Sequence, residues 1–122
     1  MNGNRFLADT NTFIYLLNKH PSLLPLLQSE WVFSFITEIE LLGKPGIAPK
    51  EVKEISSLLA ICIKAPHTES INKTAISLKQ NYKLKVPDAL IAATAIEQKI
   101  PLLTFDKDFV RIEELDLVLL EV

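Results

Sequence analysis

The chain has 122 residues, 48% of them hydrophobic, which suits one domain of ordinary size with a substantial apolar core. No apolar run is long enough to cross a membrane, the N-terminal residues lack the features of a signal peptide, and the lone Cys62 excludes a disulfide framework and a thiolate metal cage. The net charge of −2, from 13 basic and 15 acidic residues, argues mildly against a nucleic-acid partner. If cations occupied four of the carboxylates, however, only 11 acidic residues would remain against the 13 basic ones. We therefore expect a single cytoplasmic domain over residues 1–122, with RNA not excluded as a partner.

Short apolar runs and helical patterns alternate through the first half of the chain. In chain order, the predicted elements are a strand at 5–8, a helix at 11–18, a helix at 21–29, a strand at 31–35 and a helix at 36–42. Residues 43–46 contain two glycines and a proline, which end the last of these helices.

The second half continues the alternation. Its predicted elements are a helix at 49–59, a strand at 62–65, helices at 68–82 and 89–98, and strands at 102–105 and 117–120. The core-facing side chains of the helix at 68–82 are expected to be Ile71, Ala75, Ile76 and Leu78. Cys62 is expected to pack as a small hydrophobe.

The predicted strands are apolar throughout, without the alternation of a half-exposed sheet. Strands buried on both faces and separated by helices predict an α/β fold with a mostly parallel sheet between helical layers. In such folds the functional crevice lies at the carboxyl ends of the strands, where Asp9 and Asp106 fall.

Several acidic residues stand at the junctions between strands and helices, and each has an ordinary structural explanation. Asp9 suits a turn or a helix cap, and Asp88, after a proline at the head of an apolar helix, suits an N-cap. Glu40 is harder to explain, because helical spacing puts it on one face with Thr37, while Ile39 is expected to pack elsewhere. Either Asp106 or Asp108 fits an inward-facing position after the strand that Thr104 ends.

Missing motifs exclude several other functions. Glycine occurs only at positions 3, 43 and 46, so no phosphate-binding or dinucleotide-binding glycine loop is present. His20 and His67 lack metal-ligand spacing and are expected to have plain surface roles. A response-regulator receiver domain needs a phosphoacceptor aspartate after a central strand, and this chain has no aspartate between Asp9 and Asp88. A haloacid-dehalogenase phosphatase needs a second aspartate two residues after the first, and that position is Asn11. Both classes are therefore excluded.

Four segments, taken in order, carry a family resemblance. They are residues 7–18 around Asp9-Thr10-Asn11, residues 34–43 around Thr37-Glu38-Ile39-Glu40, residues 87–95 from Pro87-Asp88, and residues 103–109 around Phe105-Asp106-Lys107-Asp108. Over essentially the whole chain, this arrangement resembles the PIN domain, and within it the VapC-type toxins of bacterial toxin–antitoxin pairs.

The resemblance implies a three-layer α/β/α fold, a Mg²⁺- or Mn²⁺-dependent endoribonuclease and a cognate antitoxin. By position, the residues that match the family's acidic metal site are Asp9, Glu40, Asp88 and Asp106. Asn11, Thr37 and Thr104 match its polar surround, and Asp108 is an alternative to Asp106 or shares its role.

Mg²⁺ prefers oxygen ligands and retains several waters, so a few carboxylates and a substrate phosphate suffice to hold it. The resulting hypothesis is that Asp9, Glu40 and Asp88 hold the principal cation directly or through water, while Asp106 positions a second ion or the attacking water. A non-catalytic PIN-fold module that binds RNA or protein is the alternative.

Partner surfaces are less specific in the sequence. Lys79, Lys83 and Lys85 precede Asp88 and are candidates for phosphate contacts, although a solvated helix face is the simpler explanation. A homodimer is expected. The side chains considered for the dimer contact or for antitoxin binding are the exposed members of one set of apolar residues. That set, most of which is expected to be core, is Phe13, Leu17, Leu23, Leu24 and Trp31.

Overall fold

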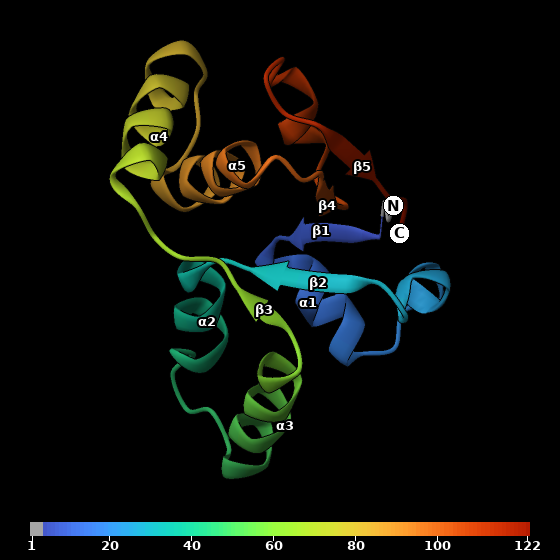
Figure 1. Ribbon diagram of the computed structural model, residues 1–122. Coiled ribbons are helices and arrows are strands. Elements are labelled where there is room, and N and C mark those ends of the chain that lie inside the picture. The colour runs from blue at the N-terminus through green and yellow to red at the C-terminus, as the bar shows by residue number, and fades with distance from the viewer. Residues whose placement is uncertain (1–3) are drawn as a thin grey trace.

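The computed structural model describes residues 4–122 and contains a five-stranded parallel sheet with the order β3-β2-β1-β4-β5 (Figure 1). The strands are β1 (Arg5–Ala8), β2 (Glu30–Phe33), β3 (Ile63–Lys64), β4 (Leu102–Thr104) and β5 (Leu117–Leu119). The prediction of a mostly parallel central sheet is therefore confirmed. Residues 1–3, which belong to the segment judged to lack a signal peptide, lie outside the described residues.

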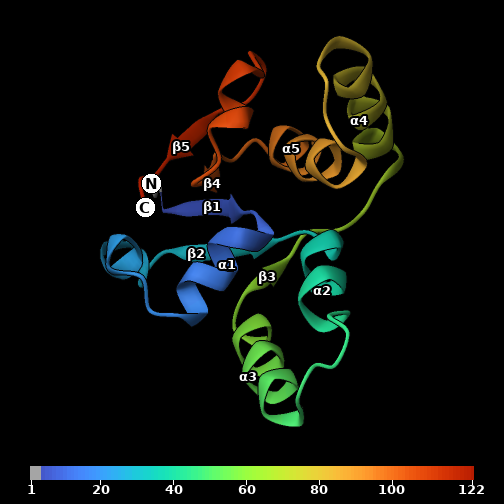
Figure 2. The same ribbon diagram turned by 180° about the vertical axis from the view of Figure 1, so that it is seen from behind.

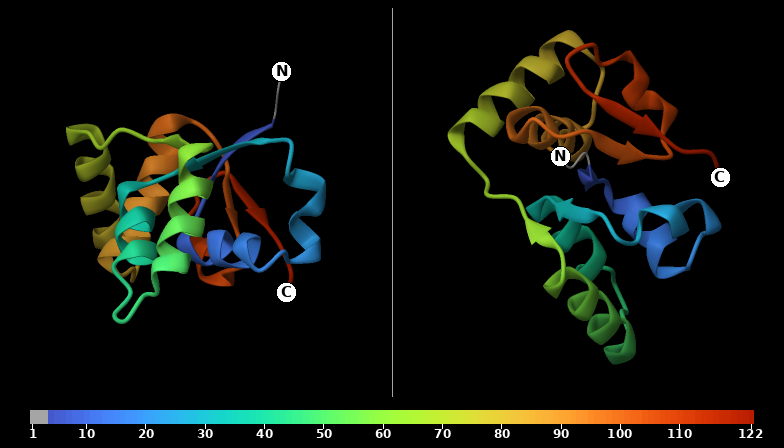
Figure 3. Two further views of the ribbon diagram at one scale, coloured as in Figure 1. Left: turned by 90° about the horizontal axis from the view of Figure 1, so that it is seen from below. Right: turned by 45° about the vertical axis from the view of Figure 1, so that its right-hand side comes forward.

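Helices cover both faces of the sheet. They are α1 (Thr10–Leu17), α2 (Phe35–Leu42), α3 (Pro49–Ala60), α4 (Glu69–Asn81) and α5 (Val86–Gln98), with 3₁₀ helices η1 (Pro21–Leu26) and η2 (Lys107–Arg111). In Figures 1 and 2, α4 and α5 lie on one side of the sheet and α1, α2 and α3 on the other, and the right panel of Figure 3 shows the same division. This arrangement is the three-layer sandwich that the family resemblance implied. None of the helices within residues 4–122 has the length and apolar character needed to span a bilayer.

The central strands are buried on both faces because successive side chains point to opposite sides of the sheet. Leu7 of β1 and Leu102 of β4 pack in the core beneath α4 and α5. Ala8 and Leu103, one residue further along each strand, pack in the second core beneath α1 and α3. Continuous apolar runs are therefore the correct signal for β1 and β4.

The prediction that every strand is buried on both faces is wrong for the two edge strands. Ile63 and Lys64 of β3 are exposed, as are Val118 and Leu119 of β5. An edge strand has a neighbour on only one side, and the helices cover it incompletely.

Some predicted positions need correction. The helix predicted at 21–29 is a short 3₁₀ helix, because Pro25 within it cannot donate the hydrogen bond that an α-helix requires. Ile76 is 58% exposed and Ile39 is 61% exposed, so neither packs in the core. Both lie on the solvent side of their helices. The core face of α4 is formed by Ile71 and Leu78, and that of α2 by Leu41.

Most of the apolar set considered for partner binding belongs to the core. Phe13, Leu23 and Trp31 are buried, and the Trp31 ring packs edge-on against Phe13 with ring centroids 5.5 Å apart. Leu24 alone of the five is exposed to a large extent, at 59%. Cys62 packs partly buried against the same core, and burial raises its thiol pKa to about 11, so it remains a protonated, weakly reactive side chain.

Candidate active site

Two of the candidate carboxylates follow neighbouring strands. Asp9 comes directly after β1, and Asp106 comes two residues after the end of β4. The two strands pair in parallel, with Ala8 opposite Leu103, so their carboxyl ends open at the same edge of the sheet. The topology therefore brings together two positions that lie far apart in the sequence.

Asp9 is held by donors from both sides of this junction. Its Oδ1 accepts hydrogen bonds from the Thr12 backbone N–H (3.0 Å) and the Thr12 hydroxyl (2.6 Å), so it caps α1. Its Oδ2 accepts a hydrogen bond from the Thr104 hydroxyl at 2.6 Å. The capping explanation considered for Asp9 is correct, but the bond from β4 shows that the same carboxylate also belongs to a long-range contact. Only 6% of the residue is exposed.

Thr104 connects Asp9 to Asp106. While its hydroxyl donates to Asp9, its Oγ1 accepts a hydrogen bond from the Asp106 backbone N–H at 3.0 Å. Asp106 in turn caps η2, because its Oδ1 accepts from the Asp108 backbone N–H at 2.8 Å. Asp108 is exposed, whereas Asp106 is half-buried. Asp106 is thus the one of the two that faces the site, and the role predicted for Asp108 stays a prediction.

Glu40 joins the site through α2. The Thr10 hydroxyl, at the start of α1, donates to Glu40 Oε1 at 2.5 Å and lies 3.0 Å from the Thr37 hydroxyl. Thr37 is fully buried, and Glu40 lies one turn further along the same helix face. The shared polar face predicted for Thr37 and Glu40 is therefore turned toward the first residues after β1.

Asp88 occupies the first turn of α5 but does not cap it. The N-cap is Lys85, so the capping explanation considered for Asp88 does not apply. Val86 and Pro87 already belong to the helix, because proline is well suited to its first turn. The side chain of Asp88 consequently has no capping duty to explain its position.

The environment of Asp88 joins the four carboxylates. Burial raises the pKa of Asp88, and the negative charges of Asp106, Asp9 and Glu40 raise it further, against a smaller opposite effect of Lys85. Like charges raise a carboxyl pKa only when they are close enough to repel its ionised form. Asp106, Asp9 and Glu40 therefore each lie within electrostatic reach of Asp88.

This electrostatic proximity is not a closed coordination shell. Among residues 4–122, no group of three or more histidine, cysteine, aspartate or glutamate side chains is placed to hold a metal ion. The oxygens of Asp9 accept hydrogen bonds from threonine donors, and Glu40 accepts one from Thr10. The donor chemistry nevertheless fits a hard divalent cation, which prefers carboxylate oxygen and retains part of its water.

Sequence reasoning missed Thr10 and Thr12. Thr12 carried a usable signal, because a polar residue three positions after Asp9 interrupts the apolar side of α1 and is now fully buried. Thr10 carried none, since its contact with Glu40 depends on the placement of α2. Asn11, which was assigned to the polar surround, is exposed, while Thr37 and Thr104 are buried.

The two histidines lie outside the carboxylate cluster. His20 is more than a plain surface residue, because its Nδ1 accepts a hydrogen bond from Ser22 N–H and its ring packs against Tyr15 and Phe105. His67 is exposed and packs on Phe35.

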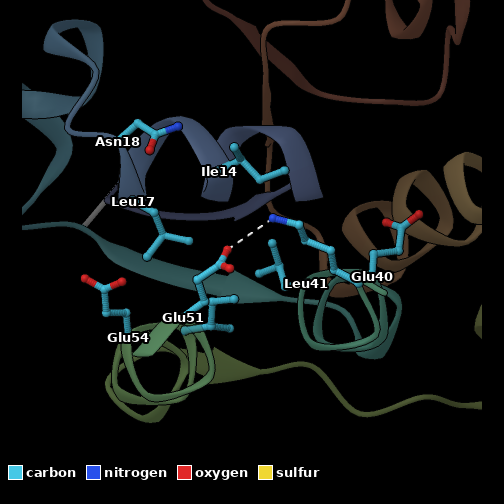
Figure 4. Close-up of a pocket in the computed structure, with 9 residues that line it drawn as sticks. Ile14, Leu17, Asn18, Glu40, Leu41, Glu51 and Glu54 are labelled. Carbon is cyan, nitrogen blue, oxygen red and sulfur yellow. Dashed lines mark hydrogen bonds and ion pairs between the residues drawn. The ribbon is translucent and has the colours of Figure 1, made fainter. Parts of the chain in front are cut away.

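A groove of about 630 Å³ opens beside Glu40 (Figure 4). It runs between α1, α2 and α3, with Glu40 toward one end and Glu54 toward the other in that view. Its apolar lining is Ile14, Leu17, Leu41 and Ile55. An ion pair between Lys44 and Glu51, with Nζ and Oε2 3.2 Å apart, crosses it.

This fold and this cluster define the class of the protein. Residues 6–115 match the family model described as PIN domain, and the chain belongs to that family. Among solved structures, it is similar to a toxin–antitoxin complex from Klebsiella pneumoniae, at 31% identity with a TM-score of 0.72, covering 96% of this chain and 99% of that one.

Two further solved structures are similar to this chain, and the second of them, below 25% identity, supports the fold alone. VapBC-1 from nontypeable Haemophilus influenzae is 27% identical, with a TM-score of 0.73, covering 94% of this chain and 97% of that one. VapBC2 from Rickettsia felis, bound to a DNA fragment from its promoter, is 23% identical, with a TM-score of 0.80, covering 93% and 97%. The predicted resemblance to VapC-type PIN-domain toxins is confirmed. No curated protein matches the sequence significantly.

Proposed function

We propose that this protein is a metal-dependent endoribonuclease that acts as the toxin of a toxin–antitoxin pair. One observation carries the proposal: carboxylates from separate elements meet at one edge of the sheet. Thr104 links Asp9 to Asp106, Thr10 links the start of α1 to Glu40, and burial together with the charges of these three carboxylates raises the pKa of Asp88. A fold that gathers carboxylates against their repulsion commonly does so for a cation. Family membership and the similarity to toxin–antitoxin complexes support the same conclusion.

Asp9, Glu40 and Asp88 are the residues we assign to the principal Mg²⁺ or Mn²⁺, directly or through water. A divalent cation there supplies charge neutralisation at the phosphodiester and lowers the pKa of a water molecule. Asp106, which faces the same cluster, is assigned to a second ion or to orientation of the attacking water. Asp108 is retained as the alternative to Asp106 or as a residue that shares its role.

Threonine hydroxyls determine how these carboxylates are presented. Thr12 and Thr104 fix both oxygens of Asp9, so its side chain has one orientation before any substrate arrives. Thr10 restrains Glu40 in the same way. Such preorganisation lowers the cost of assembling the site when RNA binds.

A cognate antitoxin is the proposed protein partner, and the groove between α1, α2 and α3 is the surface we assign to it. Its apolar lining suits a partner segment with an apolar face. Glu51 is already paired with Lys44, but Glu40 and Glu54 suit basic side chains on that segment. Because Glu40 belongs to both the groove and the carboxylate cluster, an occupant of the groove would also reach the proposed catalytic site. A homodimer and a cytoplasmic location stay predictions.

Cleavage of single-stranded RNA by the purified protein, free of antitoxin, tests the proposal. We expect cleavage with Mg²⁺ or Mn²⁺, none with EDTA, and at least a hundredfold loss in Asp9→Asn. The amide keeps a carbonyl oxygen for the Thr12 donors and directs its NH₂ to Thr104, so the fold should persist.

Asp116→Asn is the matched control, because Asp116 is exposed and precedes β5, at the opposite end of the sheet from the cluster. It should cleave like the wild type. A wild-type protein that binds RNA but does not cleave it with either metal would instead support the non-catalytic PIN-fold module.

A further inference from the structure

A basic segment lies between α4 and α5, immediately before the carboxylate cluster. All the residues from Lys79 to Lys85 line an open cavity of about 720 Å³. The chain turns there because α4 ends at Asn81, Tyr82 is extended, and α5 begins at Val86. The turn can be followed in Figure 1 between the two helix labels. Lys83 and Lys85 are exposed on it, and Lys79 is exposed in the last turn of α4.

Two cations at this turn, Lys79 and Arg111, donate to backbone carbonyls instead of carboxylates. Lys79 Nζ donates to the Leu84 carbonyl at 2.8 Å, and the Arg111 guanidinium donates to the Lys83 carbonyl. The ion pairs within residues 4–122 involve three other cations, Arg5, Lys44 and Lys64. Positive charge therefore gathers around one turn without being neutralised by a direct ion pair.

Glu113 and Glu114 contact this segment through Tyr82. Glu114 accepts a hydrogen bond from the Tyr82 hydroxyl at 2.7 Å, and the Glu113 backbone N–H donates to the same hydroxyl at 3.2 Å. These contacts hold the tyrosine against residues 113–114. Four cations, Lys79, Lys83, Lys85 and Arg111, outnumber the three carboxylates near this turn, which are Glu113, Glu114 and Asp88.

The segment is also electrostatically coupled to the cluster. Lys85 is the N-cap of α5, and Asp88 lies in the first turn of the same helix. The charge of Lys85 acts on the Asp88 carboxyl, where it favours the ionised form. A group bound at Lys85 would therefore lie beside the carboxylates.

A polyanionic substrate needs such a surface. Four carboxylates and a net charge of −2 repel an RNA backbone, and affinity for nucleic acids comes largely from cations that contact phosphates. We propose that Lys83, Lys85 and Arg111 form a subsite for the backbone phosphates of the RNA that flank the cleaved bond. This inference rests on the proposed function and adds to it the surface that receives the substrate. Lys79 has a positioning role, because its ammonium is bonded to the Leu84 carbonyl and supports the turn.

Equilibrium binding to a fluorescein-labelled single-stranded RNA tests the subsite. The measurement is made in EDTA, so that binding is separated from cleavage, and repeated over a series of salt concentrations. The double variant Lys83→Gln/Lys85→Gln should bind at least tenfold more weakly at low salt. Its slope of log affinity against log salt should fall by about 1.4, the value for two lost contacts to single-stranded phosphates.

The double variant Lys50→Gln/Lys53→Gln is the control, because it removes the same charge from exposed positions on α3. It should keep the wild-type slope, and both double variants should keep the wild-type melting temperature. Equal slopes in the two double variants would overturn the subsite, as would a wild-type protein that does not bind RNA. Failure of the subsite leaves metal-dependent cleavage intact, whereas failure of the proposed function is recognised by the absence of cleavage.

Discussion

Asp9 and Asp88 lie in one electrostatic cluster, yet the protein accommodates their charges in opposite ways. Asp9 is almost fully buried, but three hydrogen bonds from Thr12 and Thr104 satisfy its oxygens. Asp88 is half-buried at the start of α5, and both burial and three neighbouring carboxylates raise its pKa. The charge of Asp9 is compensated by the fold, whereas the charge of Asp88 is opposed by it.

The difference separates structural from functional reasons for keeping a carboxylate. Asp9 would be retained for the stability of the junction between β1 and α1 even in a protein without activity, because it caps the helix. Asp88 does not stabilise its helix as a cap, since Lys85 occupies the N-cap position. Uncompensated charge of this kind is typical of functional sites, so Asp88 is the stronger indication of activity.

Removing the compensation at Asp9 should have the largest effect on stability. In Thr104→Val, Asp9 Oδ2 loses its donor and the Asp106 backbone N–H loses its acceptor. Because both groups lie in or near the core, we expect the free energy of unfolding to fall by about 2 to 3 kcal/mol, measured by urea denaturation. Thr104→Ser keeps the hydroxyl and should lose only about 1 kcal/mol for the missing methyl group. Equal losses in the two variants would show that the hydroxyl does not compensate Asp9.

Adding a cation should reduce the contrast by compensating Asp88. If the cluster binds Mn²⁺ only when folded, a metal concentration ten times the dissociation constant stabilises the wild type by about 1.4 kcal/mol. The melting temperature should therefore rise with Mn²⁺ in the wild type and in Asp116→Asn. In Asp88→Asn the rise should be much smaller. A rise of the same size in Asp88→Asn would place the bound metal elsewhere.

The sequence was sufficient for the parts of the fold that depend on local pattern. The apolar run at 5–8 predicted β1 with its observed bounds, and the helical period between Pro49 and Leu59 predicted α3 to within one residue. Family resemblance then assigned acidic positions that no periodicity could bring together. Convergence itself depends on strand order, and the pairing of β1 with β4 cannot be read from either strand alone.

The remaining differences have tertiary causes. Asp88 looked like an N-cap because it follows a proline, but Val86 and Pro87 extend the helix by most of a turn toward Lys85. Asp106 and Asp108 were equivalent in the sequence, and they differ only because η2 turns Asp106 inward as its cap. The hydrogen bond from Thr10 to Glu40 joins two helices, so no local sequence pattern predicts it.

The smallest expected effect is the pH dependence that Asp88 itself contributes. Since its pKa in the folded protein is raised above the ordinary value of 3.8, the folded state binds the proton more tightly than the unfolded state. In EDTA, the stability of the wild type relative to Asp88→Asn should therefore rise as pH falls through the raised pKa, and the gain should be complete below 3.8. The gain should stay under about 1 kcal/mol, because solvent screens a half-exposed group.

This experiment weighs two opposing effects on one carboxylate. An aspartate in the first turn of a helix ordinarily gains about 0.3 to 1 kcal/mol from the helix dipole, which would favour its ionised form. If the dipole outweighed burial and the charges of Asp106, Asp9 and Glu40, the stability difference would change with pH in the opposite direction. Urea denaturation of both proteins between pH 3 and pH 7 measures that sign. A wild type that loses relative stability on acidification would mean that the fold compensates Asp88 as it does Asp9, and the contrast between them would not hold.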